Sequence, residues 1–372
     1  MADLTMSRRA LLRRGAGAAA GLALVGGVAA RVRGAGAEPQ VRRNVTALSA
    51  DERIDFANAV MALKSRPSPW VSGISTYDTF VLWHRDAMGC GVNAAHMGPA
   101  FFPWHRRFLR LFEETLQTIE PAVTLPYWDW TVDRSTTGAP WFDDLLGGNG
   151  DPAEGEAVMT GPFRKGSWEI SIFDPGDMDQ VPYLARNFGA SKMAAELPTA
   201  EEVEEALAIA TYDASPWNAT VPPGSSFRNA FEGWQDCAVQ GCDPVGGISP
   251  ICGSRHNIHN RVHLWVAGES SFMAHVMTDA GDGTRTDDVM GTMAASSSPN
   301  DPVFWLHHAN VDRLWAVWQE RHGLVYQPET GGPFGHNIDD PMWPYEQIGM
   351  TVTPRMVLDH RAMGYRYDTE SA

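Results

Sequence analysis

The fold is decided by residues 301–321, DPVFWLHHANVDRLWAVWQER. From position 303 onward, tryptophan and leucine recur at the spacing of one helix face, which predicts a helix over residues 303–321. The same helix carries two adjacent histidines, His307 and His308, among its large apolar residues. It is therefore expected to bring imidazole groups to the core of the domain.

Five further helices are predicted from apolar periodicity and from capping residues. Ser49 opens one of them with acidic residues in its first turn, and Thr199 begins the capping box of another. These helices cover residues 49–63, 77–88, 103–119, 199–210 and 254–266. Between residues 125 and 191, Pro, Gly, Asp and Trp dominate without periodicity, which predicts long packed loops. The fold class is therefore mainly α: a four-helix-bundle core wrapped in long loops, with a few short strands.

The first 37 residues differ from the rest of the chain. They contain SRRALL at positions 7–12, an apolar run of 16 residues from Gly15 to Ala30, and a small-residue site that ends at Ala37. This order is typical of a twin-arginine export signal. The apolar run is shorter than the roughly 20 residues that span a membrane, so a membrane anchor is disfavoured. We expect residues 1–37 to be removed, leaving residues 38–372 as one catalytic domain that is secreted, periplasmic or at the cell surface and is not stably inserted in a membrane.

The charge of the chain excludes some partners. Its formal net charge is −16, and it becomes more negative once the signal, with six Arg and one Asp, is removed. Such a surface repels nucleic acid and anionic membranes. A small or neutral substrate fits this charge, although acidity also serves solubility alone.

The four cysteines allow two interpretations. Cys237, Cys242 and Cys252 lie close together in the sequence, and Cys90 lies far from them. A zinc knuckle completed by His256 is conceivable, but the paired C-x₂-C element of such sites is missing. In an exported protein, a local disulfide in this loop is the favoured prediction.

The histidines form two groups that predict a dinuclear metal site within the bundle. His84, His96 and His105 lie in the first third of the chain, and a second group combines residues 256–263 with the pair at 307–308. His259 and His263 are four residues apart, so both imidazoles lie on one helix face. Two clusters of three histidines without a cysteine or carboxylate ligand favour copper, although zinc also accepts three imidazoles. Spacing alone does not decide between His256 and His259, or between His307 and His308.

Several strings resemble the tyrosinase family, the type-3 dinuclear copper phenol oxidases, across essentially all of residues 38–372. The two copper signatures of the family are similar to HMGPAFFPWHR at 96–106 and DPVFWLHHANVD at 301–312. Shorter matches are YDTFVLWH at 77–84, HNRVHLWV at 259–266, LPYWDW at 125–130 and YRY at 365–367. The resemblance selects His259 over His256, and it selects His308, four residues before Asp312. It implies that the copper ligands are His84, His96, His105, His259, His263 and His308.

The resemblance also implies a reaction. Two copper ions and the co-substrate O₂ would hydroxylate monophenols at the ortho position and oxidise o-diphenols to o-quinones. By the same resemblance, Glu232 and Asn260 hold a water that removes the phenol proton. Asp312 is expected to orient the copper-ligating histidines without binding copper itself. Arg42 or Arg43 is expected to contact the tyrosine pair at 365–367.

The chain departs from the family pattern at one position, and other functions of the same site remain as alternatives. Ala94 stands where many fungal and plant members carry a cysteine linked to the second histidine, so no such thioether is expected, and Cys90 lies six residues before His96. The rivals are a catechol oxidase or o-aminophenol oxidase without monophenolase activity, and an oxygen carrier of the haemocyanin kind. An export signal that carries folded protein is also compatible with copper loading beforehand by a helper protein.

Overall fold

The computed structural model describes most of the region that follows the expected export signal. It covers residues 39–371 except for 89–93, 175–179, 192–193, 223, 234–236, 241–248, 253–257 and 269–290, and it describes only the backbone of 237–240 and 249–252. Residues 38–372 form one compact unit. The predicted export signal, Cys90 and His256 lie outside the described residues, so the predictions that involve them stay predictions.

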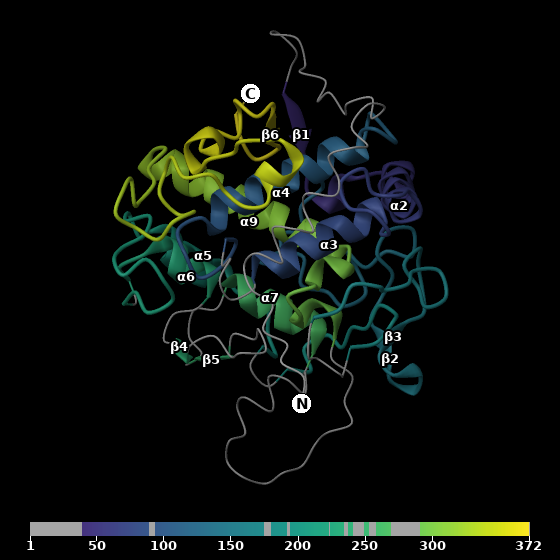
Figure 1. Ribbon diagram of the computed structural model, residues 1–372. Helices are drawn as coiled ribbons and strands as arrows, with labels where there is room; N and C mark the ends of the chain where they lie inside the picture. The colour runs from purple at the N-terminus through teal and green to yellow at the C-terminus, as the bar shows by residue number, and fades with distance from the viewer. Residues whose placement is uncertain are drawn as a thin grey trace, which may run out of the picture. The chain divides into compact units, whose positions relative to one another are not determined.

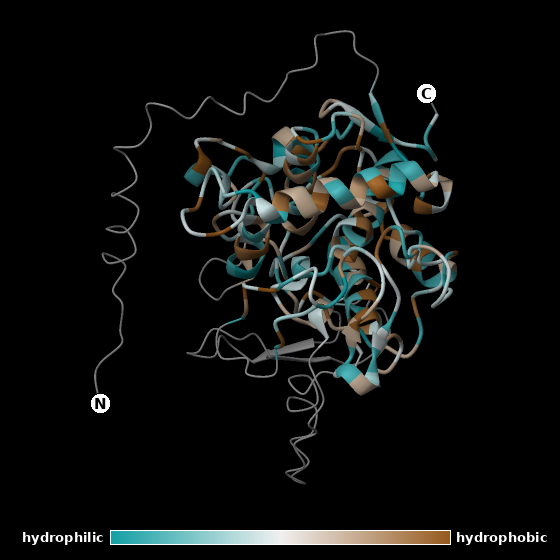
Figure 2. Cartoon of the chain, turned by 90° about the vertical axis from the view of Figure 1, so that its right-hand side faces the viewer, coloured by the Kyte–Doolittle hydropathy of each residue, from teal (hydrophilic) through white to brown (hydrophobic). Residues whose placement is uncertain are grey.

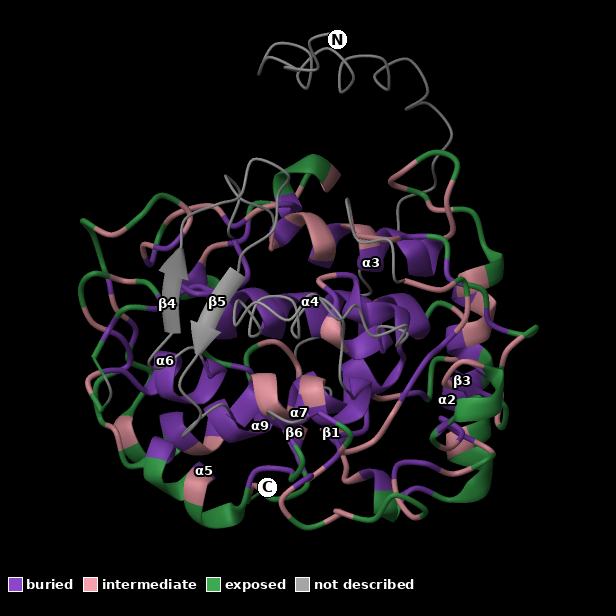
Figure 3. Ribbon diagram, turned by 90° about the horizontal axis from the view of Figure 1, so that it is seen from below, coloured by how far each residue is buried: buried purple, intermediate pink, exposed green. Residues whose placement is uncertain are grey.

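Four helices form the core of this unit (Figure 1). They are α3 (Thr76–Ala87), α4 (Phe101–Leu116), α7 (Ile258–Ala267) and α9 (Val303–His322). The rings of Phe112 on α4 and Trp305 on α9 stack with their centroids 3.5 Å apart. In Figure 3 the buried colour follows α4 and α9 along their length, whereas exposed residues lie mainly on the peripheral loops. The prediction of a mainly α fold with a helical core is confirmed.

Capping residues and apolar faces explain where the helices begin. Ser49 and Glu52 form a capping box on α2 (Ala50–Ser65), and Thr199 and Glu202 form another on α5 (Ala200–Leu207). The hydrophobic side of each helix is turned inward, and Figure 2 shows apolar and polar residues alternating along the helices.

The helix boundaries differ from the sequence prediction by one to three residues at most ends. Helix α4 begins at Phe101, two residues before Pro103. A proline is tolerated there because the first N–H groups of a helix have no intrahelical acceptor. Of the predicted helix over 254–266, the structure describes the part from Ile258 onward, and residues 254–257 lie outside the described residues. A short helix, α6 (Phe227–Glu232), was not predicted because six residues are too few to establish a periodicity.

The strands are short, as expected. Antiparallel pairs join β2 (Gly150–Asp151) to β3 (Ala157–Val158), and β4 (Cys237–Gln240) to β5 (Ser249–Cys252). The register places Cys237 opposite Cys252. A parallel pair joins β1 (Gln40–Arg42) to β6 (Tyr365–Tyr367), so the two ends of the described chain lie side by side (Figure 1).

Arg42 fixes this junction of the chain ends onto the core. Its guanidinium lies 3.6 Å from the ring centroid of Tyr365 and donates hydrogen bonds to Glu113 of α4 and Asp312 of α9. The hydroxyls of Tyr365 and Tyr367 both donate to Asp312, each at 2.6 Å. Of the two arginines proposed from the resemblance, Arg42 is therefore the one that contacts the tyrosine pair.

Asp312 has a different role from the one expected. The carboxylate is buried and also accepts a hydrogen bond of 2.6 Å from Arg106 of α4. Within the described residues its printed hydrogen bonds go to arginines and tyrosines and none to a histidine. Asp312 therefore holds α4 against α9, and it acts on the histidines through the placement of these helices.

No helix among the described residues has the length and apolar character needed to cross a membrane.

Candidate metal centre

The first histidine cluster is assembled from two helices and the turn between them. His84 lies on α3, His105 lies on the first turns of α4, and His96 precedes that helix. The Nε2 atom of His84 is 3.2 Å from Nε2 of His96 and 3.5 Å from Nε2 of His105. His84 thus lies next to both other histidines in the buried core, and His84 and His105 also lie close enough to His308 to form a group of possible ligands.

The second cluster is assembled from α7 and α9. His259 and His263 lie one turn apart on α7, as their spacing predicted, and His308 lies on α9. The Nε2 atom of His308 is 3.2 Å from that of His259 and 3.3 Å from that of His263. The two clusters are in contact, because the rings of His105 and His308 stack at 4.3 Å with an interplanar angle of 15°.

Main-chain carbonyl groups orient four of these six rings. A carbonyl oxygen can only accept a hydrogen bond, so each Nδ1 that faces one carries the proton and leaves the Nε2 lone pair free for a metal. The pairs are His84 with Ser296 (2.7 Å), His105 with Phe101 (2.8 Å), His259 with Glu232 (3.2 Å) and His263 with Met293 (2.8 Å).

Burial favours the neutral form of five histidines in the two clusters by lowering their pKa. It lowers the pKa of His263 from 6.5 to about 4. Burial is also the largest cause that lowers the pKa of His84, His105, His259 and His308 well below 6.5, and the neighbouring histidines lower it further. Neutral imidazole is the form that binds a metal ion, so the core favours coordination over protonation.

The spacing of the nitrogens fits metal coordination. Imidazole nitrogens bound at about 2.0 Å to one tetrahedral ion lie about 3.3 Å apart. The Nε2 separations in the two clusters, 3.2 to 3.5 Å, agree with this value. All-imidazole coordination also suits copper well.

His307 is buried beside the second cluster, and its ring packs against the cluster in a different way from that of His308. Its ring stacks on that of His259, with centroids 5.2 Å apart and an interplanar angle of 17°. It lies close enough to His259, His263 and His308 to belong to the same group of possible ligands. Neither ring nitrogen has a hydrogen-bond partner among the described residues. The short Nε2 contacts of His259 and His263, however, go to His308.

Comparison with known proteins identifies the family. The profile of the common central domain of tyrosinase matches residues 74–321. This chain belongs to the tyrosinase family. The tyrosinase of Streptomyces glaucescens is 39% identical over 333 residues, which cover 89% of this chain and 99% of that relative. The grixazone synthase of Streptomyces griseus is 35% identical over 353 residues, covering 88% and 99%. The chain is therefore a type-3 copper oxidoreductase.

Solved structures show the same fold. A polyphenol oxidase variant from Thermothelomyces thermophila superposes with a TM-score of 0.57 at 23% identity, covering 88% of each chain. A tyrosinase from Burkholderia thailandensis superposes with a TM-score of 0.51 at 19% identity, covering 90% of this chain and 74% of the other. The helical core that holds the histidines is thus a tyrosinase-type core.

Glu232 lies between the two clusters of this tyrosinase-type site. Its carboxylate accepts a hydrogen bond of 2.6 Å from the N–H of Met97 and lies 3.3 Å from Nδ1 of His96. The other carboxylate oxygen accepts from Arg228 at 3.0 Å. The main-chain oxygen of Glu232 faces His259, so one residue contacts a histidine of each cluster.

Two features of this region were not found from the sequence. Met97 adopts a left-handed backbone with φ 55°, which is uncommon for a residue other than glycine, and the hydrogen bond from its N–H to Glu232 stabilises that turn beside His96. The side-chain oxygen of Asn260 faces Nδ1 of His259 at 2.9 Å. The hydrogen bond between Met97 and Glu232 joins residues 135 positions apart, so no spacing rule predicts it.

Proposed function

We propose that this tyrosinase-family chain hydroxylates monophenols at the ortho position and oxidises o-diphenols to o-quinones, with O₂ as co-substrate. The observation that carries the proposal is the meeting of six histidines in two adjoining clusters, with Nε2 separations of 3.2 to 3.5 Å from His84 in one and from His308 in the other. The names of its Streptomyces relatives support the same activity. A small phenol is the substrate class.

We assign one copper ion to His84, His96 and His105, and a second to His259, His263 and His308. When bound, the copper pair supplies the redox chemistry that uses O₂. The protein contributes a buried setting and carbonyl groups that orient four of the six rings. His307 is left as a packing residue because its neighbours on α7 direct their Nε2 atoms to His308.

Glu232 and Asn260 are the residues we assign to phenol deprotonation. A phenol has a pKa near 10, so it must lose a proton before its ring is attacked. Both residues contact the same imidazole, His259, and the Glu232 carboxylate is buried beside His96. A water held between them would accept the proton from a phenol that enters the site.

A paired substitution tests this assignment. Glu232→Gln and Asn260→Ala are expected to lower the rate on monophenols at least about 10-fold relative to the rate on o-diphenols, as loss of a general base does. Copper content is measured alongside the rates. Glu202→Gln is a matched control, because Glu202 pairs with Arg261 of α7 and contacts no histidine of the clusters in the described structure.

The outcomes separate three roles. A selective loss of monophenol hydroxylation with two coppers bound supports the proposal. An equal loss on both substrates with lowered copper content makes Glu232 a positioning residue. An unchanged ratio contradicts the assignment and favours a catechol oxidase or an o-aminophenol oxidase. The relative named grixazone synthase shows that family membership alone does not decide this point.

We also propose export by the twin-arginine route, with copper loading before export by a separate helper protein. The sequence of residues 7–37 supports the route. Sequencing the N-terminus of the exported protein tests it, and a terminus other than Glu38 contradicts cleavage after Ala37. Full copper loading of the cytoplasmic chain in the absence of any other protein would contradict the helper.

A further inference from the structure

One short segment contacts both histidine clusters. Residues 291–300, which include the 3-10 turns η3 (Thr292–Ala294) and η4 (Ser298–Asn300), run beside α3 and α7. The carbonyl oxygen of Met293 accepts the Nδ1–H of His263 at 2.8 Å, and that of Ser296 accepts the Nδ1–H of His84 at 2.7 Å. These carbonyl groups are three residues apart, yet they serve histidines of different clusters.

A single carboxylate holds this segment in place. Asp174, from the long loop before it, accepts hydrogen bonds from the N–H of Ser296 at 2.7 Å, the hydroxyl of Ser296 at 2.6 Å and the N–H of Ser297 at 2.9 Å. Hydrogen bonds to an ionised acceptor are stronger than those between neutral groups. The turn that presents the Ser296 carbonyl to His84 is therefore fixed by Asp174.

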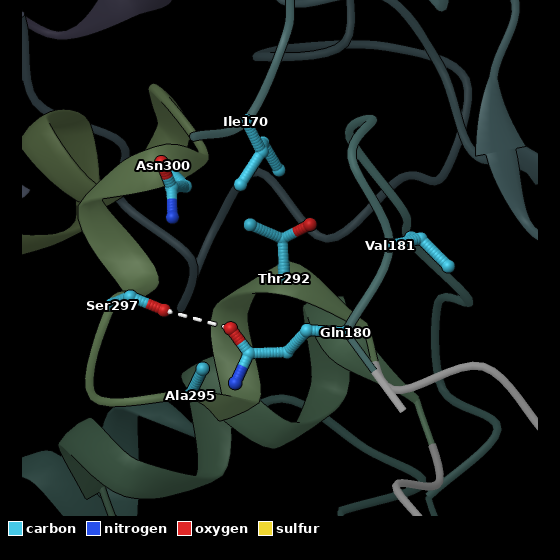
Figure 4. A pocket seen from close by; sticks show the side chains of 7 residues that line it. All are labelled: Ile170, Gln180, Val181, Thr292, Ala295, Ser297 and Asn300. Carbon is cyan, nitrogen blue, oxygen red and sulfur yellow. Dashed lines mark hydrogen bonds between the residues drawn. The ribbon is translucent and has the colours of Figure 1, made fainter. Parts of the chain in front are cut away.

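Gln180 stabilises the same turn through two further hydrogen bonds. Its side-chain oxygen accepts from the hydroxyl of Ser297 at 3.3 Å (Figure 4) and from the N–H of Asp174 at 3.1 Å. The hollow beside Gln180 measures about 10 Å³, which holds no more than one water molecule. This side of the segment therefore stabilises the turn, and its hollow is too small to bind a phenol.

The start of the segment is also held by close packing and hydrogen bonds. A Cβ at Gly291 would lie 2.0 Å from the carbonyl oxygen of Ala267, the last residue of α7. The N–H of Thr292 donates to the carbonyl of Ala185, and the hydroxyl of Thr292 accepts from the N–H of Ala185. The segment is thus held at two places, at Thr292 by Ala185 and at Ser296 and Ser297 by Asp174, and the Met293 carbonyl lies between them.

We propose that Asp174 is a positioning residue that couples the two halves of the centre, because it fixes a segment whose carbonyl groups set the ring orientation of one ligand in each half. This inference rests on the proposed copper ligands. Partners that orient metal-ligating histidines typically contribute 10- to 100-fold to metal affinity. Since the Ser296 and Met293 carbonyls belong to one braced segment, releasing Asp174 should disturb both ions together.

Asp174→Asn in the mature chain tests the inference. An amide nitrogen in place of one carboxylate oxygen would face either the two donors of Ser296 or the N–H of Ser297, and it would loosen the turn. Copper affinity and stoichiometry are measured by titration against a competing chelator, with circular dichroism of the metal-free protein as the readout of folding. We expect both ions to bind roughly 10- to 100-fold more weakly.

Two further variants complete the experiment. Asp144→Asn breaks an ion pair with Arg53 of α2 by the same chemical change, and it should leave copper affinity unchanged. Ser296→Ala removes only the hydroxyl bond to Asp174 and retains the carbonyl that faces His84. It should weaken both ions by a smaller factor.

The outcomes distinguish this inference from the proposed function. A wild-type chain that fails to bind two copper ions contradicts the proposed function. A wild-type chain that binds two, with Asp174→Asn equally tight or weakened at one ion only, overturns the coupling. If Asp174→Asn does not fold, Ser296→Ala decides, and unchanged affinity in that variant overturns the inference.

Discussion

Two sides of the histidine centre are held in different ways. On the helix side, His105 of α4 and His308 of α9 stack on each other, and behind them Asp312 and Arg106 join the same two helices. On the loop side, His84 and His263 take their orientation from carbonyl groups of residues 291–300. The helix side thus relies on buried charges, and the loop side on hydrogen bonds to the main chain.

The difference predicts unequal costs of substitution. Removing one member of a buried ion pair leaves a charge without compensation and typically costs about 3–5 kcal/mol. Losing one ordinary hydrogen bond costs about 1 kcal/mol. We therefore expect changes on the helix side to affect the stability of the whole domain, and changes on the loop side to affect copper binding first.

The largest effect is expected at adjacent residues of α9. His308→Ala should leave one copper ion per chain and lower phenol oxidation by at least about 100-fold, because a ligand contributes more than the partners that orient it. His307→Phe preserves a buried ring against His259 and should retain two ions. Copper content and oxidation rates check both variants. If His307→Phe loses an ion and His308→Ala does not, the assignment of the ligand is wrong.

The next effect concerns stability. Asp312→Ala should lower the free energy of unfolding by about 3–5 kcal/mol, because Arg42 and Arg106 would remain buried without their carboxylate. Asp174→Asn should lower it by less, about 1.5–3 kcal/mol, because it weakens hydrogen bonds to a charged group but leaves no buried charge without its partner. Urea unfolding of the metal-free proteins measures the difference. Arg43→Ala is the control, since its ion pair with Glu52 is exposed and contributes under about 1 kcal/mol. Equal losses in the Asp312 and Asp174 variants would remove the distinction between the two sides.

The smallest effect is a pH dependence in two steps. His263 has a pKa of about 4 when folded and about 6.5 when unfolded. The unfolded chain binds more protons between these values, so the free energy of unfolding falls as pH drops from about 6.5 to 4. Burial would raise the pKa of Asp312 and of Glu113, but Arg106 and Arg42 hold both below their usual values.

Stability from these two carboxylates is present above their unfolded pKa values of about 4 and is lost as pH falls further. Acid should therefore weaken the histidine core first and the Arg42 network second. Unfolding of the metal-free protein, measured from pH 7.5 to pH 3, checks the order. A single transition confined to pH below 4 would mean that the buried histidines do not contribute.

The sequence was sufficient for the features that depend on local spacing. The N-cap at Ser49, the capping box at Thr199 and the pairing of His259 with His263 on one helix face appear as predicted. Periodicity also yielded the four core helices, with boundaries shifted by a few residues. These features follow from hydrogen bonds and side-chain directions within one or two helical turns, which the order of residues fixes directly.

Only the tertiary structure decided how the histidines are oriented and supported. The sequence left His307 and His308 open, and the family resemblance left Arg42 and Arg43 open. The Nε2 atom of His308 contacts those of His259 and His263, as the choice made from the resemblance requires, and the ring contact of Arg42 with Tyr365 separates Arg42 from Arg43. Asp174 carried no signal in the sequence, because its three bonds reach residues more than 120 positions away. Helix spacing is a local property of the chain, but the direction of an imidazole ring depends on a carbonyl group that another segment brings to it.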